Sequence, residues 1–249
     1  DEIRAGIRSA LGRDMFAEEH GRAPLDAREL SGFIARQSRS TRRAVAGYDL
    51  TFTPVKTIAI LWALAPRALS RKIESAHRRA VQKAIDYLEE HAAFTRIGPG
   101  SAAQINTTGL IIAAFDHRDS RAGDPNLHTH ITVSNKVCAI GPDGIERWLA
   151  LDGAALYREI VAASEVYNTA MEAELVTLGF RFVGTDRGNG KRCVREIAGV
   201  PAELIARFSS RRAAIETRLG ELSKAFQNQP GREPTLAESL ALSQQATLD

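Results

Sequence analysis

The chain has 249 residues, of which 44% are hydrophobic and 25% charged, a balance that is ordinary for a globular protein with a sizeable core. Its longest apolar stretch, Ile58–Ala65, is far too short to cross a bilayer, so the composition excludes a membrane-spanning protein. Two cysteines, Cys138 and Cys193, are too few for a disulfide framework, and neither has a CxxC partner. We therefore expect a reducing, cytoplasmic setting.

The positive charge is placed unevenly along the sequence. The formal net charge is only +3 and the isoelectric point is near 9.0. Four arginines with no acid among them nevertheless fall within eight residues: Arg36, Arg39, Arg42 and Arg43. Such a cluster would attract a polyanion, because neutralised phosphates release their counterions. The cluster is equally typical of a solvated helix end, so charge alone leaves both interpretations open.

The first part of the chain predicts helices on either side of a short strand. Residues 1–46 have a polar helical pattern with a turn at Gly21–Pro24. The alternating run Tyr48–Thr53 is typical of a strand. Residues 55–91 return to helical spacing, with a break at Pro66.

The middle of the chain predicts a β-hairpin. Two β-rich runs, 105–117 and 127–139, are separated by the charged and turn-rich residues 118–126. A further turn at Gly141–Gly144 leads into a short run around Trp148, a side chain that we expect in the core.

The last part of the chain continues this mixture. It predicts a helix over 154–178, a second hairpin from 180–183 and 193–197, and helices after Pro201. Helices and hairpins that follow one another in this order predict an α+β fold with an antiparallel β-sheet flanked by helices and a helical C-terminal extension.

Three of the six histidines are spaced to meet at the loop end of the first hairpin. Side chains alternate along a strand, so His128 and His130 project to the same side, about 7 Å apart. His117 ends the preceding strand, and pairing across the loop would bring the three imidazoles together. Three protein ligands leave positions open for substrate, which is typical of catalytic metal sites. One histidine on a strand is more often a packed or surface residue, so the prediction depends on the convergence of all three.

Asp49 is the candidate acid. It lies on the predicted strand 48–53 with Thr51 and Thr53 on its face. Its carboxylate could orient a metal-bound histidine through the second ring nitrogen, or take a proton from a nucleophile. It could equally cap a turn after Gly47, and the pattern alone does not decide between these roles.

Two segments carry a specific combination of motifs. Residues 47–56 read GYDLTFTPVK, and residues 117–130 read HRDSRAGDPNLHTH. Together they resemble the relaxase domain of MobF-type conjugative relaxases, the TrwC/TraI-like group of the HUH endonuclease superfamily. The resemblance extends from about Ala44 to Leu222. Thr129 departs from the His-hydrophobic-His form of the wider superfamily, although threonine is usual there in this branch.

The resemblance implies a palm-like, ferredoxin/Rep-like sheet and an enzyme that nicks one strand of DNA at a plasmid transfer origin. In such relaxases a tyrosine attacks the scissile phosphate reversibly, leaving a 5′-phosphotyrosine link and a free 3′-OH. The three histidines would hold a divalent ion, with Mg²⁺ or Mn²⁺ expected and Zn²⁺ or Ni²⁺ as alternatives. Asp49 matches the acid that assists the tyrosine. Lys56, Arg42 and Arg43 match places where the family meets DNA phosphates.

The same resemblance implies single-stranded DNA of a transfer origin as the partner, with other conjugation proteins as further partners. It implies a monomer in the bacterial cytoplasm without membrane insertion. Residues 1–225 would form the relaxase (nickase) domain, and residues 226–249 a polar linker or tail. The turn Gly188–Lys191 lacks the spacing of a phosphate-binding P-loop, so we expect no helicase engine in this sequence.

The nucleophile is the main departure from the family pattern. In these relaxases the catalytic tyrosines precede the strand that carries the acid, whereas no tyrosine precedes Tyr48 here. Strand alternation turns Tyr48 away from Asp49, and the other three tyrosines lie in helical patterns. Since the sequence also begins at Asp1 within a helical pattern, we expect a fragment that lacks its nucleophilic tyrosine. Such a fragment would bind metal and DNA without cleaving.

Two other functions stay open. A three-histidine metallohydrolase or oxygenase could activate water against a small molecule. A non-catalytic DNA-binding module could use the metal structurally. Salt-dependent binding of single-stranded DNA would favour the relaxase over the small-molecule enzyme.

Overall fold

The computed structural model describes residues 2–37, 44–185, 193–228 and 233–248. These residues fall into two compact units, one up to Val45 and one from Ala46 onward, and each is described by itself. The first unit is a pair of helices, α1 (Glu2–His20) and α2 (Ala27–Gln37). Its core contains Phe16 and Phe33, whose rings meet edge to face with centroids 5.1 Å apart. Two helices joined by a short turn are what the sequence predicted for this region.

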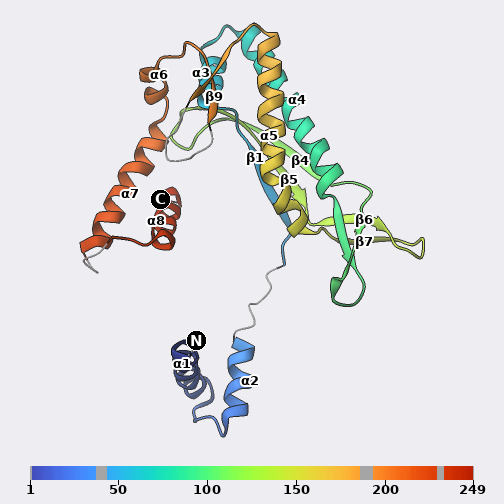
Figure 1. Cartoon of the computed structure of the whole chain (residues 1–249), viewed down its shortest axis with the longest axis vertical. Coiled ribbons are helices and arrows are strands. Elements are labelled where there is room, and N and C mark those ends of the chain that lie inside the picture. Colours follow the sequence, from blue (N-terminus) through green and yellow to red (C-terminus); the bar gives the residue numbers. More distant parts are fainter. Residues whose placement is uncertain (1, 38–43, 186–192, 229–232, 249) are drawn as a thin grey trace. The chain divides into compact units, whose positions relative to one another are not determined.

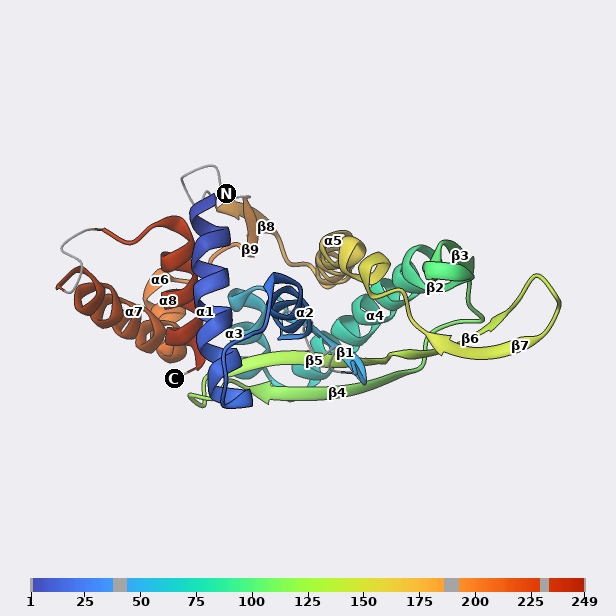
Figure 2. The same ribbon diagram turned by 90° about the horizontal axis from the view of Figure 1, so that it is seen from below.

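The second unit is built on a three-stranded antiparallel sheet, which Figures 1 and 2 show from two directions. Its strands are β1 (Gly47–Phe52), β4 (Ile112–Asp119) and β5 (Pro125–Ser134), in the order β1-β5-β4. Because β5 lies in the middle, its residues have neighbours on both sides: His130, for example, pairs with Thr51 of β1 and with Phe115 of β4.

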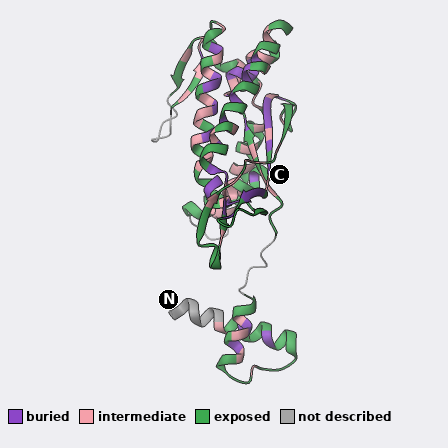
Figure 3. Ribbon diagram, turned by 90° about the vertical axis from the view of Figure 1, so that its right-hand side faces the viewer, coloured by how far each residue is buried: buried purple, intermediate pink, exposed green. Residues whose placement is uncertain are grey.

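Three helices accompany this sheet: α3 (Lys56–Leu64), α4 (Arg67–Ala92) and α5 (Gly153–Thr177). Helices α4 and α5 pack against each other, and their apolar stripes share one core with the sheet. Ile131 and Val133 of β5 are fully buried in that core. Figure 3 colours the buried residues, which lie on the inner sides of the helices and on the sheet. One face of the sheet is thus devoted to packing, and the other is left for the site.

Three hairpins extend the unit. They pair β2 (Phe94–Ile97) with β3 (Ala103–Asn106), β6 (Lys136–Ile140) with β7 (Glu146–Ala150), and β8 (Phe182–Thr185) with β9 (Val194–Ile197); a short 3₁₀ turn, η1 (Pro99–Ser101), joins β2 to β3.

The strand boundaries differ from the predicted runs in two places. The predicted run 105–117 is split between β3 and β4, because Gly109 adopts a φ of +135° that no strand residue takes. The run 127–139 is split at Asn135, after which the chain leaves the main sheet for β6. The expectation that Trp148 lies in the core is wrong, since 54% of it is exposed on the β6–β7 hairpin. A two-stranded ribbon has no second layer to bury it.

The chain ends in helices α6 (Ala202–Arg207), α7 (Ser210–Asn228) and α8 (Leu236–Leu248). Helix α8 packs on α7 and occupies most of the segment expected to be a polar linker or tail, 226–249. Leucine and alanine fill seven of its 13 positions, a composition that favours a helix. The α+β class, the antiparallel sheet and the helical C-terminal extension are confirmed. No helix in the described ranges combines the length and apolarity needed to cross a membrane.

Candidate metal centre

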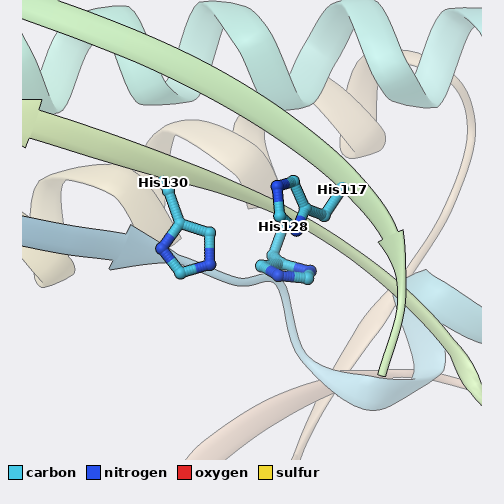
Figure 4. Close-up of side chains that lie close together, drawn as sticks. All are labelled: His117, His128 and His130. Carbon is cyan, nitrogen blue, oxygen red and sulfur yellow. The ribbon is translucent and has the colours of Figure 1, made fainter. Parts of the chain in front are cut away.

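The hairpin formed by β4 and β5 brings His117, His128 and His130 together. His117 and His128 are direct partners in the strand register, and His130 follows two residues later on the same face of β5. One ring nitrogen from each lies within 4.8 Å of the others. The three ring centroids are 5.1 to 5.2 Å apart, and Figure 4 shows the imidazoles gathered at the loop end of the hairpin. The convergence predicted from strand alternation is therefore present.

Hydrogen bonds orient two of these rings. The Nδ1 of His128 lies 2.7 Å from the backbone oxygen of Asn126, closer than the side-chain amide of that residue at 3.2 Å. The Nδ1 of His130 lies 2.9 and 3.0 Å from the two carboxylate oxygens of Asp49. Oxygen acceptors at both Nδ1 atoms place the ring protons there, so each Nε2 keeps its lone pair free for a metal ion.

The placement of Asp49 decides between the two roles left open by the sequence. It lies on β1 opposite Thr132 of β5 and reaches across to His130, so it does not cap a turn after Gly47. The hydroxyl of Thr51 lies 3.3 Å from the same His130 nitrogen and offers a second, weaker acceptor. A carboxylate behind a histidine ligand is a common way to fix the ring and increase its basicity toward a metal.

The histidine cluster fits a divalent cation by its donor chemistry. Three neutral imidazoles make a nitrogen donor set that suits Zn²⁺, Ni²⁺ or Cu²⁺, and three protein ligands leave further positions for water or substrate oxygens, which also suit Mg²⁺ and Mn²⁺. His128 is buried, His130 is partly buried and His117 is exposed. A site that is open on one side can admit a substrate as large as a nucleic-acid strand.

A family model described as TrwC relaxase matches residues 6–248, almost the whole chain. The chain belongs to the TrwC relaxase family. The match confirms the resemblance to MobF-type relaxases that was based on the Asp49 strand and the histidine spacing.

Individual relaxases agree with this assignment. Two curated relatives, each named multifunctional conjugation protein TraI, are 30% identical (Escherichia coli) and 28% identical (Escherichia coli strain K12) over 224 residues, which is 87% of this chain. The chain spans only 12% of the length of either relative.

Among solved structures, the metal-free complex of conjugative relaxase TrwC with oriT DNA is 28% identical, with a TM-score of 0.62 over 92% of this chain and 80% of that one. The metal-bound complex has the same identity and TM-score and is covered over 78% of its length. A copper-bound complex is 26% identical, with a TM-score of 0.63 over 98% of this chain and 86% of that chain.

Lys56, a predicted DNA contact, is partly buried and hydrogen-bonded within the protein. This lysine begins α3, and its ammonium group donates a hydrogen bond to the backbone oxygen of Pro125 at 2.9 Å. Burial lowers its pKa, while the nearby carboxylate of Asp124 opposes that shift. The ammonium thereby ties α3 to the start of β5, three residues before His128. The other two predicted DNA contacts, Arg42 and Arg43, lie outside the described residues.

Asp124 anchors the same loop to the C-terminal helices. It is 6% exposed and accepts hydrogen bonds from the hydroxyl of Ser210 at 2.7 Å and the backbone nitrogen of Arg211 at 3.2 Å. Burial alone would raise its pKa, but these bonds and the charge of Lys56 hold the pKa below its usual value. An anion at the first turn of α7 is favourable for the helix dipole. Sequence analysis missed this contact, because Asp124 stands in a turn-rich loop where an aspartate attracts no notice.

All four tyrosines of the chain are described, and none is placed at the metal centre. Tyr48 points away from Asp49 and packs on Tyr157, with ring centroids 5.9 Å apart, and on Gly153, where any larger residue would overlap its ring. Tyr87 donates a hydrogen bond to a carboxylate of α5. Tyr167 is 1% exposed, and burial raises its pKa well above the ordinary value. The predicted orientation of Tyr48 is confirmed.

A further histidine, which the sequence did not single out, is buried on α4. His77 is 1% exposed and lies directly behind β5. In the sequence, its burial is indicated by helical spacing, which places it among Ile73, Ala80 and Ala84 on the buried stripe of that helix. A polar ring on such a stripe needs partners, and the sequence alone does not show which residues supply them.

Proposed function

We propose that this chain is the metal- and substrate-binding part of a relaxase that nicks one strand of DNA at a plasmid transfer origin by transesterification at a phosphodiester. The observation that carries the proposal is the set of three converging imidazoles with Asp49 behind His130, on a solvent-facing side of the sheet in a chain of the TrwC relaxase family. The solved relatives are complexes with oriT DNA, in metal-free and metal-bound forms.

Each site residue has a definite task in this proposal. His117, His128 and His130 would hold a divalent ion, which when bound supplies positive charge against the charge that develops on the phosphoryl oxygens. Asp49 fixes the ring of His130. Because its side chain is 56% exposed, it also stays accessible to accept the proton of an attacking hydroxyl.

The attacking hydroxyl would come from a group other than the four tyrosines described above. Tyr167 is sealed in the core, Tyr48 faces the opposite side of the sheet from Asp49, and Tyr87 is bound to a glutamate. Tyr157 belongs to α5, on the packing side of the sheet with Tyr48. A nucleophile has to reach within hydrogen-bond distance of its base, and none of these positions does so.

Arginine-lined clefts on both sides of the hairpin loop favour a nucleic-acid substrate. A cleft of about 750 Å³ is lined by Arg67 and Arg71 of α4 and by Arg118 at the end of β4, together with two acids, Asp119 and Glu74, of which Glu74 pairs with Arg118. A second cleft of about 370 Å³ is lined by three further arginines: Arg121, Arg211 and Arg218. Cations along a strand path neutralise phosphates and release counterions, so binding should weaken steeply with salt.

Fluorescence anisotropy on the chain as it stands tests this function. Single-stranded 25-mers enriched from a random pool on the wild-type protein should bind more tightly when Mn²⁺ or Zn²⁺ is added. His128→Ala should lose that increment and keep the metal-free affinity. Any covalent adduct between the protein and such an oligonucleotide should form only when metal is present.

The control is His91→Ala, which removes an exposed histidine of α4 whose ring stacks on Tyr87. This variant should behave like the wild type in both assays. Salt-independent binding, or an adduct that forms equally well without metal and without His128, would refute the proposal. Metal-dependent hydrolysis of a small ester without any DNA affinity would favour the three-histidine hydrolase instead.

A further inference from the structure

A continuous chain of buried polar groups lies directly behind the metal-binding hairpin. His77 of α4 places its Nδ1 2.8 Å from the hydroxyl of Tyr167 on α5 and its Nε2 2.8 Å from the hydroxyl of Thr129 on β5. All three residues are at most 2% exposed. Polar groups buried this deeply cost free energy unless they are hydrogen-bonded, and here each one finds a partner.

The chain continues to the neighbouring strand and to solvent. The Thr129 hydroxyl donates to one carboxylate oxygen of Asp116 on β4 at 2.7 Å, and the guanidinium of Arg78 donates to the other at 3.0 Å. A guanidinium has only donors, and the Thr129 hydroxyl gives its proton to the other oxygen, so both oxygens of Asp116 act as acceptors at this end.

This double acceptor fixes the direction of every bond in the chain. Since Thr129 gives its only proton to Asp116, its oxygen must accept a proton from the Nε2 of His77. The Nδ1 of His77 is then an acceptor for the Tyr167 hydroxyl. This arrangement requires a neutral His77, and burial lowers the pKa of His77 to about 4. One tautomer of His77 and one orientation of each hydroxyl, on Tyr167 and on Thr129, therefore satisfy all of these hydrogen bonds together.

The position of these groups relative to the histidine cluster is what gives them a role. Thr129 stands between His128 and His130, and Asp116 immediately precedes His117. Asp116 and Thr129 are direct partners in the β4–β5 register, and they face the helices while the histidines face the other way. The polar chain therefore fixes both strands to α4 and α5 at the points that carry all three ligands.

We propose that Thr129 and His77 are positioning residues for the metal centre: the hydroxyl that Thr129 presents to His77 and Asp116 sets the twist and separation of the two ligand-bearing strands. The inference deepens the proposed function and rests on its metal site. Valine at position 129 has nearly the shape of threonine but offers no hydroxyl. It would therefore leave the buried N–H of His77 without an acceptor. The two strands would then be held by packing and ladder hydrogen bonds alone.

Removing groups that orient metal ligands from behind typically lowers metal affinity 10- to 100-fold. Thr129→Val preserves shape and should weaken Co²⁺ binding by about 10-fold, because the ligands lose their common anchor but not their donor atoms. It should also alter the d–d absorption spectrum of bound Co²⁺, which depends on ligand geometry. Thr129→Ser keeps the hydroxyl and should restore both properties.

The experiment measures Co²⁺ affinity by competition with a chelating dye, together with the absorption spectrum, well below the unfolding temperature. The matched control is Thr95→Val. Thr95 is fully buried and donates to the backbone oxygen of Ala150 in another part of the unit. This control should lower the melting temperature and leave Co²⁺ binding unchanged. Tyr167→Phe, which removes only the distal donor, should shift the spectrum in the same direction as Thr129→Val and to a smaller extent.

The outcomes separate this inference from the proposed function. If Thr129→Val and Tyr167→Phe both bind Co²⁺ with wild-type affinity and spectrum, the polar chain is merely structural and the inference is wrong. If Thr129→Val does not fold, Tyr167→Phe decides alone. If the wild type binds no Co²⁺, or His128→Ala binds it equally well, then the metal site itself is wrong and the inference falls with it.

Discussion

Replacing Asp49 should weaken metal binding without disturbing the fold. The two carboxylate oxygens lie 2.9 and 3.0 Å from the Nδ1 of His130, so the ring is held with its Nε2 toward the other imidazoles. Asp49→Ala removes both the charge and the acceptor, and Asp49→Asn removes the charge but keeps an acceptor oxygen. We expect a clear loss of affinity for alanine and a smaller loss for asparagine.

The size of the effect follows from the geometry. Losing a carboxylate behind a histidine ligand costs about 10- to 100-fold in affinity. Side-chain exposure is 56% for Asp49 and 31% for His130, so water screens the interaction and places the loss at the lower end. Thr51, at 3.3 Å from the same nitrogen, partly replaces the lost acceptor. We therefore expect about a 10-fold loss for Asp49→Ala, equivalent to about 1.4 kcal/mol.

Competition between the protein and a chelating dye for Zn²⁺ or Mn²⁺, at fixed pH and salt, measures this loss. The control is Asp143→Asn, which removes a carboxylate of similar exposure that is paired with Arg147 at the β6–β7 turn. It should bind metal like the wild type. Wild-type affinity for both Asp49 variants would show that the carboxylate does not orient His130, and its remaining role would be that of a proton acceptor.

Three further predictions concern the ligands, the DNA path and the buried histidine. His128→Ala should abolish stoichiometric metal binding, as measured by mass spectrometry of the purified protein, because it removes the only buried ligand of the three. Combining Arg67→Ala with Arg71→Ala should lower the slope of log affinity for single-stranded DNA against log salt by about 1.4, or 0.7 per lost phosphate contact; an unchanged slope would remove the α4 cleft from the DNA path. Burial lowers the pKa of His77 to about 4 against an ordinary 6.5, so the unfolded state takes up its proton first, and folding stability should fall by about 3 kcal/mol as the pH drops from 6.5 to 4. Denaturant titrations between pH 6.5 and 4 should show this loss of folding stability in the wild type and not in His77→Gln.

The sequence was sufficient to predict the convergence of the three histidines because two local rules determine it. Alternation along β5 places His128 and His130 on one face, and a hairpin closed by a turn-rich loop places His117 opposite them. Neither rule needs knowledge of the rest of the chain. The same alternation correctly placed Tyr48 on the face opposite Asp49. Motif spacing then led to the relaxase family, which the family comparison confirms.

What the sequence did not reveal depends on contacts between distant segments. The bond from Lys56 to Pro125 spans 69 residues and that from Ser210 to Asp124 spans 86. The family resemblance predicted that Lys56 meets DNA phosphates, and the sequence did not show that its ammonium group also donates a hydrogen bond to Pro125 at the start of β5. Residues 226–249 were expected to form a polar linker or tail, and the polar residues of that segment do not show that its helix α8 packs on α7.

The polar residues His128, Thr129 and His130 lie in β5, the central strand of the sheet, and its two faces explain how they are accommodated there. His128 and His130 face the open side, where a substrate can reach them, and Thr129 faces α4 and α5. Because side chains alternate along a strand, three consecutive residues divide between the two faces: the outer two face the open side and the middle one faces the helices. The open face can stay uncovered because the strand is secured from behind by hydrogen bonds of fixed direction. On this view threonine at the centre of the His-Thr-His motif and histidine at position 77 form a matched pair. A hydrophobic residue at the centre would require an apolar residue on the facing helix, because an imidazole there would be left with an unsatisfied N–H.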